Sequence, residues 1–372
     1  MVYIIRVLHV ISGNDNGGGG KHVLNICSND MDNMQCHMLC IGKGPLYDEA
    51  LNNNIDVFSL TFNEIVREKL KSIVESKKID IINFHGAKSN FLYLLLGKSI
   101  KKPCAVTIHS DYRYDFLNST LKKYFYTPLS IMGLRRFKNY ICVSNYLKML
   151  LEEKKFIGDK YVVNNGVNFN SVRITTPKEA LRAQFNLDEH DFVYVMIARM
   201  HPVKNHKKLI EAFYMLQGQF QDTKLLLVGD GELKESLSSL AENLKLTDKV
   251  IFAGFRNNPL DFINASDISI LTSFNEGGAP PLAILESALI KKPVICSDVG
   301  DMRSVISGKS GYLVNPKNKQ DIFSKMKEAY LNRNNLCNMG QNLYKDMSDK
   351  FSMHRFWKNY YYAYLHILSG VK

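Results

Sequence analysis

The sequence predicts an α/β protein made of two doubly wound parallel-sheet domains. Two observations support this fold class. Short apolar runs alternate with helical patterns along the chain, and this alternation occurs in two successive series. Between the two series lies VVNNGVNFNSVRITTPKEALRAQFNL (162–187), which is rich in Asn, Ser and Thr and contains a Pro, as is typical of a linker.

The predicted strands are apolar runs without strict alternation, as expected where helices cover both faces of a parallel sheet. In the first half they are 4–11 (IIRVLHVI), 80–86 (DIINFHG), 104–110 (CAVTIHS) and 139–145 (NYICVSN). In the second half they are 192–199 (FVYVMIAR), 224–231 (KLLLVGDG), 249–254 (KVIFAG), 267–273 (DISILTS) and 293–298 (PVICSD). We expect domains at 1–170 and 171–352, with an amphipathic aromatic helix at 353–372 that packs back across the interface.

Composition limits the class of protein. With 372 residues, 45% of them hydrophobic and 23% charged, the chain is long enough for two domains with full cores. The first residues, MVYIIRVLHVIS, lack a basic leader and a cleavage site, and FLYLLL (91–96) is too short to span a bilayer. The seven cysteines are odd in number and scattered, which suits a reducing compartment. We therefore expect a cytoplasmic protein.

Cys36, His37 and Cys40 lie close together in the sequence and could suggest a metal site. No second pair of ligands follows at the spacing of a zinc finger. We interpret these cysteines as ordinary buried thiols.

The net charge of +12 is unevenly distributed. Residues 81–151 hold eleven Lys or Arg against two Asp, a balance of +9, which leaves +3 for the remainder. Aromatic residues interleave with the cations in KKYFYTPLSIMGLRRFKNY (122–140). This basic segment has three possible interpretations: a solvated basic face, a nucleic-acid groove, or a surface that rests on anionic lipid. No nucleic-acid motif accompanies the charge, so we expect no nucleic-acid partner.

Loops that follow strands carry the remaining motifs, as expected where ligands bind at the carboxyl ends of parallel strands. SGNDNGGGGKHVLNI (12–26) places four glycines before a helix, where backbone amides can approach an anion, although a flexible turn would look the same. IARMHPVKNHKKLIEAF (197–213) places Arg199 at a strand end and Lys204 before a helix. Such cations suit a diphosphate, although alone they could be a surface cluster.

A third loop, NEGGAPPLAILE (275–286), has one carboxylate before a glycine turn and a second within the helix that follows. Read by itself, this pair of glutamates would more often be structural than functional. Its order after Arg199 and Lys204 favours a functional reading.

Together these motifs resemble the retaining glycosyltransferases of family four, which have the GT-B fold and a two-glutamate motif. The resemblance covers almost the whole chain. It includes, in order, the glycine loop, TIHSDY, VSNYLK, NNGV, ARMHPVKNHKKLIEAF, LLLVGDGEL, VIFAGF and SFNEGGAPPLAILESALIKKPVICSDVG. It implies that the first domain binds the acceptor and the second binds a nucleotide sugar.

The resemblance also implies roles for single residues. Arg199 and Lys204 match the cations that neutralise the donor diphosphate, and His109 matches a histidine that faces the transferred sugar. Glu276 matches the glutamate that contacts the sugar, and Glu286 the one that holds the ribose hydroxyls. The glycines that match donor-contacting positions are Gly17 and Gly18 in the first loop and Gly277 and Gly278 beside Glu276.

One departure from the family concerns spacing. The family usually has seven residues between the two glutamates, whereas GGAPPLAIL contains nine. Pro281 to Glu286 keeps the usual arrangement, so the additional residues lie in the glycine turn. The departure therefore bears on the sugar side of the motif and leaves the nucleotide side intact.

The reaction implied is retaining and independent of metal. Metal-dependent transferases generally keep an Asp-x-Asp after a strand, and the only such triplet, Asp30-Met31-Asp32, precedes one. Arg199, Lys204 and the glycine amides would stabilise the leaving phosphate instead. No cofactor is expected apart from the nucleotide sugar, most often a UDP-sugar in this family.

The acceptor is expected to be a lipid-linked glycan or glycolipid of cell-surface polysaccharide synthesis, with the enzyme resting on the inner face of an anionic membrane. A nucleotide-sugar epimerase or a phosphorylase would share the fold, but neither the acid and base set of the first nor the cofactor lysine of the second can be identified. A basic, non-catalytic binding protein would leave Arg199, Lys204, Glu276 and Glu286 without a purpose.

Overall fold

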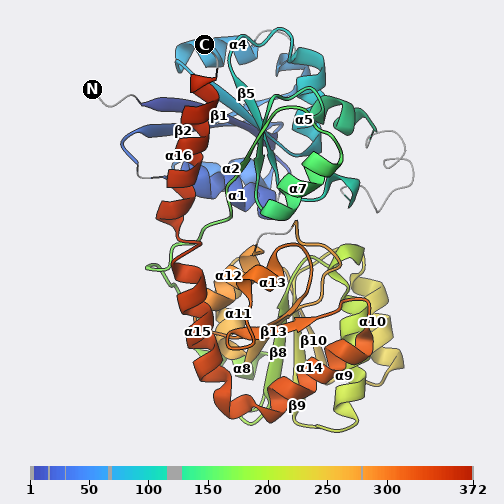
Figure 1. The fold of residues 1–372 in the computed structure, drawn as a ribbon. Coiled ribbons are helices and arrows are strands. Elements are labelled where there is room, and N and C mark those ends of the chain that lie inside the picture. The colour runs from blue at the N-terminus through green and yellow to red at the C-terminus, as the bar shows by residue number, and fades with distance from the viewer. Residues whose placement is uncertain are drawn as a thin grey trace. The chain divides into compact units, whose positions relative to one another are not determined.

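The fold was analysed in a computed structural model, which describes residues 4–15, 17–29, 31–65, 69–114, 128–277 and 280–370. The chain divides into two compact units (Figure 1). Unit 1 comprises Met1–Gly166 together with Met353–Lys372, and unit 2 comprises Val167–Ser352. Each unit is described by itself below.

Unit 1 is built on a parallel sheet with the strand order β3-β2-β1-β4-β5-β6-β7 in the described residues. Chain order reverses between β1 and β4, because β1 pairs with both β2 and β4. The strands are β1 (Ile5–Ser12), β2 (Met34–Ile41), β3 (Val57–Leu60), β4 (Ile81–His85), β5 (Cys104–Ile108), β6 (Asn139–Cys142) and β7 (Asp159–Val162).

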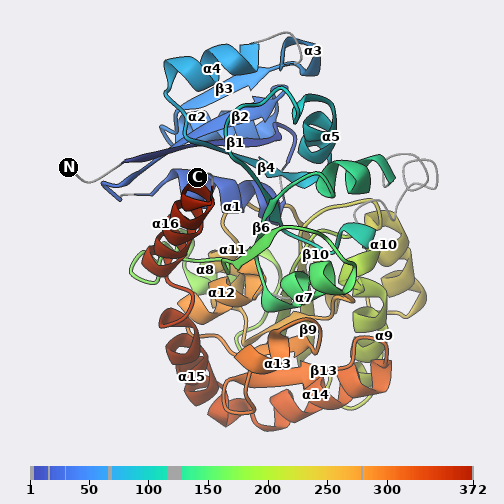
Figure 2. The same ribbon diagram turned by 45° about the horizontal axis from the view of Figure 1, so that its top comes forward.

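Helices cover this sheet, and the last helix of the chain is one of them. They are α1 (Gly18–Cys27), α2 (Pro45–Asn52), α3 (Phe62–Glu64), α4 (Leu70–Ser76), α5 (Gly86–Leu96), η2 (Tyr112–Tyr114), α7 (Asn145–Glu153) and α16 (Met353–Ser369). Figures 1 and 2 show α16 in red beside the blue strands of unit 1. Its Phe356, Trp357, Tyr360 and Tyr364 complete the core that contains Val7, Ile81 and Ala105.

Unit 2 has a second parallel sheet with the order β10-β9-β8-β11-β12-β13, again with a reversal at its centre. The strands are β8 (Phe192–Ile197), β9 (Thr223–Val228), β10 (Val250–Gly254), β11 (Ile268–Leu271), β12 (Val294–Ser297) and β13 (Gly311–Val314). The helices are α8 (Lys178–Gln184), η3 (Pro202–Lys204), α9 (His206–Gln217), α10 (Lys234–Asn243), α11 (Pro259–Ala265), α12 (Leu282–Leu289), α13 (Met302–Val305), α14 (Lys319–Leu331), η4 (Arg333–Asn335) and α15 (Leu336–Ser348).

Apolar clusters lie on both faces of the second sheet. One joins the sheet to α9, α12, α14 and α15, and the other joins it to α8 and α11. Coverage on both faces explains why its strands are continuous apolar runs. The predicted fold class, two doubly wound parallel sheets, is confirmed.

All nine predicted strands are present, and so is β2, the strand expected after Asp32, but the sequence pattern missed β3, β7 and β13. β2 includes Cys36, His37 and Cys40, whose side chains are all buried. His37 is bound to Asp56 through Nδ1 at 2.8 Å. The interpretation of Cys36 and Cys40 as buried thiols is therefore confirmed.

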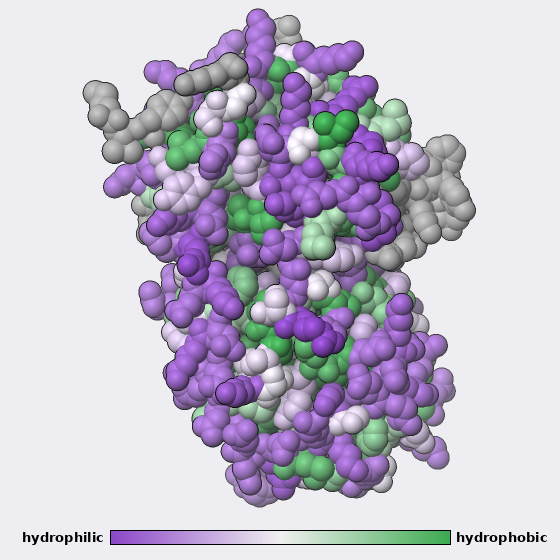
Figure 3. All heavy atoms as spheres, viewed as in Figure 1, coloured by the Kyte–Doolittle hydropathy of each residue, from purple (hydrophilic) through white to green (hydrophobic). Residues whose placement is uncertain are grey.

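The surface is mainly hydrophilic on the face drawn in Figure 3, with apolar side chains scattered among charged ones. In the part of the chain that the structure describes, no helix is long and apolar enough to cross a membrane.

Candidate active site

The centre of the second sheet brings two of the predicted donor residues, Lys204 and Glu276, together. β8 and β11 are neighbours in this sheet, yet the chain leaves them toward opposite sides. Open α/β sheets bind ligands at such a switch point, beyond the carboxyl ends of the strands. Arg199 and Lys204 follow β8, and Glu276 follows β11.

Lys204 and Glu276, which lie 72 positions apart in the sequence, form a bidentate ion pair. Nζ of Lys204 donates to Oε1 of Glu276 at 2.7 Å and to Oε2 at 2.8 Å. The Glu276 side chain is 7% exposed and that of Lys204 is 24% exposed. Because the carboxylate is largely withdrawn from water, it depends on this cation for its charge compensation.

Asn205, for which the motifs predicted no role, ties the Lys204 loop to its neighbours. It adopts a left-handed conformation with φ of 60° and is buried. Its Nδ2 donates to the carbonyl oxygens of Thr272 at 3.0 Å and Pro316 at 2.8 Å. The backbone N–H of Phe274 also donates to the carbonyl of Val203 at 2.8 Å. These bonds hold the loops after β8 and β11 against each other.

The glycines of the VGDGEL motif support the same loop from the other side. Gly229 and Gly231 have φ of 143° and 156°. A Cβ added at Gly229 would lie 2.1 Å from the carbonyl oxygen of Ala198, and one at Gly231 would lie 2.6 Å from that of Met200. Only glycine allows the backbone after β9 to approach the Arg199 loop this closely.

Arg199 and Glu286 lie where the motifs predicted. Arg199 is exposed at the end of β8, and burial together with its charge lowers the pKa of nearby His201. Glu286 is half-buried within α12. Gly277 has φ of 60° and its N–H donates to Oδ1 of Asn275 at 2.8 Å, whereas Gly278 lies outside the described residues.

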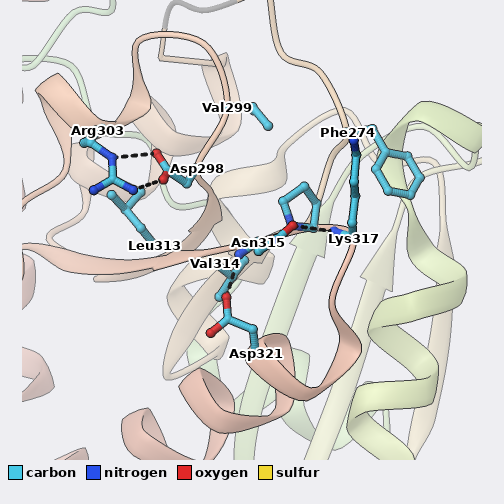
Figure 4. A pocket seen from close by; sticks show the side chains of 10 residues that line it. Phe274, Asp298, Val299, Arg303, Leu313, Val314, Asn315, Lys317 and Asp321 are labelled. Atoms are coloured by element: carbon cyan, nitrogen blue, oxygen red, sulfur yellow. Dashed lines mark hydrogen bonds and ion pairs between the residues drawn. The ribbon is translucent and has the colours of Figure 1, made fainter.

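A cavity of ≈ 670 Å³ lies at the same edge of the second sheet, beyond β11, β12 and β13 (Figure 4). It adjoins the Lys204 loop through Pro316, which accepts from Asn205. In Figure 4, the Arg303–Asp298 pair lies on one side of the cavity, and Phe274 and Lys317 lie on the other. The lining residues are Phe274, Asp298, Val299, Arg303, Leu313, Val314, Asn315, Pro316, Lys317 and Asp321.

The glycine loop of unit 1 already holds a carboxylate. Oδ1 of Asp15 accepts from the backbone N–H of Gly17 at 3.0 Å and of Gly20 at 3.1 Å. Gly17 precedes α1, and Gly18 is its first residue, with open space where a Cβ would be. The sequence had assigned the amides of this loop to an anion, and the structure shows an internal anion using two of them.

His109 lies directly after β5 and belongs to a cluster of histidines that the sequence did not reveal. Its Nε2 lies 3.0 Å from Nδ1 of His85, and its ring meets that of His22 edge-on with 4.7 Å between centroids. Burial lowers the pKa of His109 to about 4. Burial, assisted by neighbouring histidines, also holds the pKa values of His22 and His85 well below the usual range. The cluster is therefore neutral at pH 7.

These lowered pKa values predict that unit 1 loses stability in mild acid. A histidine whose folded pKa is depressed stabilises the fold fully above about pH 6.5, and each pH unit below that removes up to about 1.4 kcal/mol per histidine. Trp357, the single tryptophan, is packed in the core of unit 1 and reports its unfolding by fluorescence. The urea midpoint of this signal should fall steeply from pH 6.5 toward pH 4.5.

His190→Gln supplies the control for this measurement, because His190 is exposed in unit 2 and should leave the pH dependence unchanged. A urea midpoint that stays level between pH 7 and pH 5 would contradict the neutral cluster.

Within the described ranges, no group of three or more His, Cys, Asp or Glu side chains is arranged to hold a metal ion. Asp32 is exposed, and Asp30 lies outside those ranges.

Two models of known protein families match the chain, one over most of the first unit and one over most of the second. The family model described as Glycosyltransferase Family 4 matches residues 16–171, and the model described as Glycosyl transferases group 1 matches residues 177–346. The chain belongs to glycosyltransferase family four. The family predicted from the motifs is confirmed, and so is the prediction of a glycosyltransferase enzyme.

Relatives of this glycosyltransferase have similar lengths. It is 26% identical over 294 residues to the UDP-Gal:alpha-D-GlcNAc-diphosphoundecaprenol alpha-1,3-galactosyltransferase of Escherichia coli, covering 75% of each chain. It is 24% identical over 340 residues to the N-acetyl-alpha-D-glucosaminyl L-malate synthase of Bacillus anthracis, covering 88% of this chain and 85% of that one.

Among solved structures, Anabaena HepE in complex with UDP-glucose matches this glycosyltransferase with a TM-score of 0.80 at 20% identity. The match covers 95% of this chain and 97% of that one. At this level of identity the likeness shows the fold, which is the predicted GT-B fold.

Proposed function

We propose that this enzyme transfers a sugar, with retention of anomeric configuration, from a UDP-sugar to a lipid-linked glycan or glycolipid. The name of the E. coli relative specifies a UDP-sugar donor and a diphosphoundecaprenol-linked acceptor, and HepE was solved with UDP-glucose. The B. anthracis relative is named for an L-malate product, so a small soluble acceptor is the competing possibility.

The Lys204–Glu276 pair is the observation that carries the proposal. A glutamate and a lysine held together at the switch point place a cation and a carboxylate beside one ligand position. The cation is suited to a phosphate oxygen and the carboxylate to sugar hydroxyls. The adjoining cavity, lined by charges of both signs, is roomy enough for the sugar.

Chemistry at this site follows from charge. Transfer breaks the bond between the anomeric carbon and the diphosphate oxygen, so negative charge grows on the leaving phosphate. Arg199 and Lys204 stabilise that charge, and the need for a metal ion disappears. In a retaining reaction the acceptor oxygen attacks from the face that the phosphate leaves, and the phosphate takes the acceptor proton. No separate general base is required.

The other site residues complete the donor site. We assign Glu276, with Gly277 and Gly278, to the sugar, and Glu286 to the ribose hydroxyls. We assign His109, Gly17 and Gly18 to the donor as well, because the family resemblance implies these roles.

Nucleotide release measured on a panel of UDP- and GDP-sugars, followed by product mass and anomeric NMR, tests the function. We expect release with a UDP-sugar, stimulated by an undecaprenyl-diphosphate-linked glycan, with the α configuration retained. The same rate is expected in EDTA. Activity that is lost in EDTA and restored by manganese would overturn the metal-free chemistry, and stimulation by a small hydroxy acid alone would overturn the lipid-linked acceptor.

A membrane-facing surface in unit 1 would fit a lipid-linked acceptor, but its apolar residues differ from those predicted from the sequence. Phe137 and Tyr140, taken there as aromatic side chains among the cations, are buried in the core, so that part of the prediction is wrong. Lys122, Lys123, Phe125 and Tyr126 lie outside the described residues.

Other apolar side chains of unit 1 are exposed beside cations and can form this surface instead of Phe137 and Tyr140. Leu95 and Met132 are 52% and 53% exposed. The helical segment 128–134 lies against α5, because a Cβ at Gly133 would meet the carbonyl oxygen of Asn90 at 2.1 Å. Arg136 is exposed beside them, and its guanidinium donates to the carbonyl of Leu94 at 2.6 Å. Exposed apolar groups next to cations are what an anionic bilayer surface binds.

We predict that the protein sediments with anionic vesicles and not with neutral ones. Each cation near the leaflet contributes about 1 kcal/mol, and salt screens this attraction over a Debye length of about 8 Å at physiological ionic strength. Changing Lys122, Lys123, Arg135 and Arg136 to Glu should therefore abolish most of the binding, as should high salt.

The matched control reverses four exposed lysines of unit 2, namely Lys234, Lys245, Lys291 and Lys309. Equal losses in both variants would mean that only net charge matters, and equal sedimentation of wild type and the unit 1 variant would mean that the surface is merely solvated.

A further inference from the structure

Three histidines of unit 1 form a chain of ring-to-ring hydrogen bonds across β1, β4 and β5. Nδ1 of His9 lies 3.0 Å from Nε2 of His85, and Nδ1 of His85 lies 3.0 Å from Nε2 of His109. Strand register places them in a row, because His9 pairs with Asn83 and His85 pairs with Thr107, two residues before His109. His9 and His85 are buried, and His109 is half-buried at the strand end.

Only two proton arrangements are open to three neutral imidazoles linked in this way. A neutral ring has one N–H and one bare nitrogen, and each shared bond needs one of each. If His85 donates from Nδ1 to His109, then His9 donates from Nδ1 to His85, and the remaining proton sits on Nδ1 of His109. If the direction is reversed, the remaining proton sits on Nε2 of His9. The two ends of the chain are therefore coupled.

The surroundings of His9, at the buried end of the row of histidines, decide between these two proton arrangements. Nε2 of His9 is buried and has no hydrogen-bond partner among the described residues. Cys36 is a polar neighbour of this histidine, and contacts first with Cys27 and then with His9 lower the pKa of this thiol. No hydrogen bond between Sγ of Cys36 and Nε2 of His9 has acceptable geometry, so the geometry leaves this nitrogen without an acceptor. Burying an N–H without an acceptor is unfavourable, and buried N–H groups without a partner are rarer in proteins than buried acceptors without one. The proton therefore leaves His9 Nε2 and appears at the other end.

We propose that His85 and His9 are positioning residues that fix the proton of His109 on Nδ1, so that this nitrogen donates a hydrogen bond to the substrate. The inference rests on the proposed placement of His109 at the transferred sugar. In the described part of the chain, Nδ1 of His109 has no hydrogen-bond partner, whereas its Nε2 is occupied by His85. The hydrogen bond donated by Nδ1 of His109 would be accepted by an oxygen of the nucleotide sugar.

His22 braces the ring of His109 from the side. Its Nδ1 donates to Oδ1 of Asn165 at 2.7 Å, so its Nε2 is bare and accepts from the hydroxyl of Tyr360 at 2.6 Å. Both nitrogens of His22 are thus engaged, and it meets His109 only through an edge-to-face contact. His22 can orient His109 but cannot exchange a proton with it, which confines the coupling to the row of three.

Nitrogen NMR tests the proton positions directly on the whole protein. With 15N-histidine labelling, two-bond and three-bond couplings distinguish the two tautomers, and single His→Gln variants assign the signals. We expect His9, His85 and His109 all to carry the proton on Nδ1 at pH 7.5. A signal showing Nε2–H on any of the three would overturn the proposal.

Kinetics tests the consequence. His85→Gln keeps the polarity, because the amide can donate to His109 and accept from His9, and it should retain kcat within about threefold. His85→Leu removes both bonds and should lower kcat by about tenfold while the affinity for UDP is unchanged. A purely structural role would lower thermal stability without this difference between Gln and Leu.

His37→Leu is the matched control, because His37 is a buried histidine on β2 of the same sheet that lies outside the row. It should leave kcat unchanged even if it lowers the Tm. Loss of turnover in His109→Ala together with full turnover in His85→Leu would overturn the relay and leave the proposed function standing. Full turnover in His109→Ala would instead remove His109 from the sugar, and the tautomers seen by NMR would then have no catalytic consequence.

Discussion

Replacing Arg199 or Lys204 by Ala is expected to lower turnover by about two orders of magnitude or more, with the larger share in kcat. Both cations follow β8 at the carboxyl edge of the second sheet, where we propose that the leaving diphosphate gains charge. Lys204→Ala has a second effect, because it removes the only hydrogen-bonded cation described for Glu276 and leaves a nearly buried carboxylate uncompensated. Steady-state rates at saturating UDP-sugar measure this.

Controls separate the two effects of Lys204. Lys207→Ala, which removes an exposed cation one turn away in α9, should leave kcat unchanged. The double variant Lys204→Ala/Glu276→Gln lacks the stranded charge, so it should recover thermal stability but not turnover. Unchanged turnover in both Arg199→Ala and Lys204→Ala would remove these cations from the mechanism.

Substitution of the two glutamates is expected to separate nucleotide binding from transfer. Glu286→Ala should weaken UDP binding by about 1–3 kcal/mol, since it strands a pair of hydrogen-bonded ribose hydroxyls. Glu276→Ala and His109→Ala should lower transfer while UDP still binds. The ion pair sharpens this expectation, because removing the Glu276 carboxylate releases Lys204 for the diphosphate, so UDP should bind Glu276→Ala at least as tightly as wild type.

Calorimetry with UDP on the three variants decides the matter, and Glu242→Ala, an exposed acid in α10, serves as the comparison. Equal losses of UDP affinity in all three site variants would contradict the division of labour between the two glutamates.

The strands that the sequence revealed most clearly are apolar runs buried along most of their length, such as β8 and β9. The missed strands lack that signal for physical reasons. β3 and β7 are four-residue strands at the two edges of the first sheet, where burial is incomplete. β13 is a four-residue strand at the edge of the second sheet, and it begins with Gly311.

The candidate site was predictable only in part. Family motifs pointed to Lys204 and Glu276, but nothing in the sequence showed that one pairs with the other across 72 positions. His9 and His85 were missed because their neighbours are set by strand order and register, which put β1 beside β4 and β4 beside β5. A signal was present, since LHV, NFH and TIH each place a histidine in or just after a predicted strand, and neighbouring parallel strands end at the same edge.

Helix α16 also sets an order of events during synthesis. Unit 2 is a single continuous stretch, whereas unit 1 takes its last helix from the far end of the chain. Until the ribosome has released Tyr360 and Tyr364, the sheet face around Val7, Ile81 and Ala105 is uncovered, and Asn83 and Thr107 lack their tyrosine partners. Unit 2 can fold while the chain is still tethered to the ribosome, but the first half of the polypeptide keeps an apolar face open to chaperones until α16 has been synthesised and released.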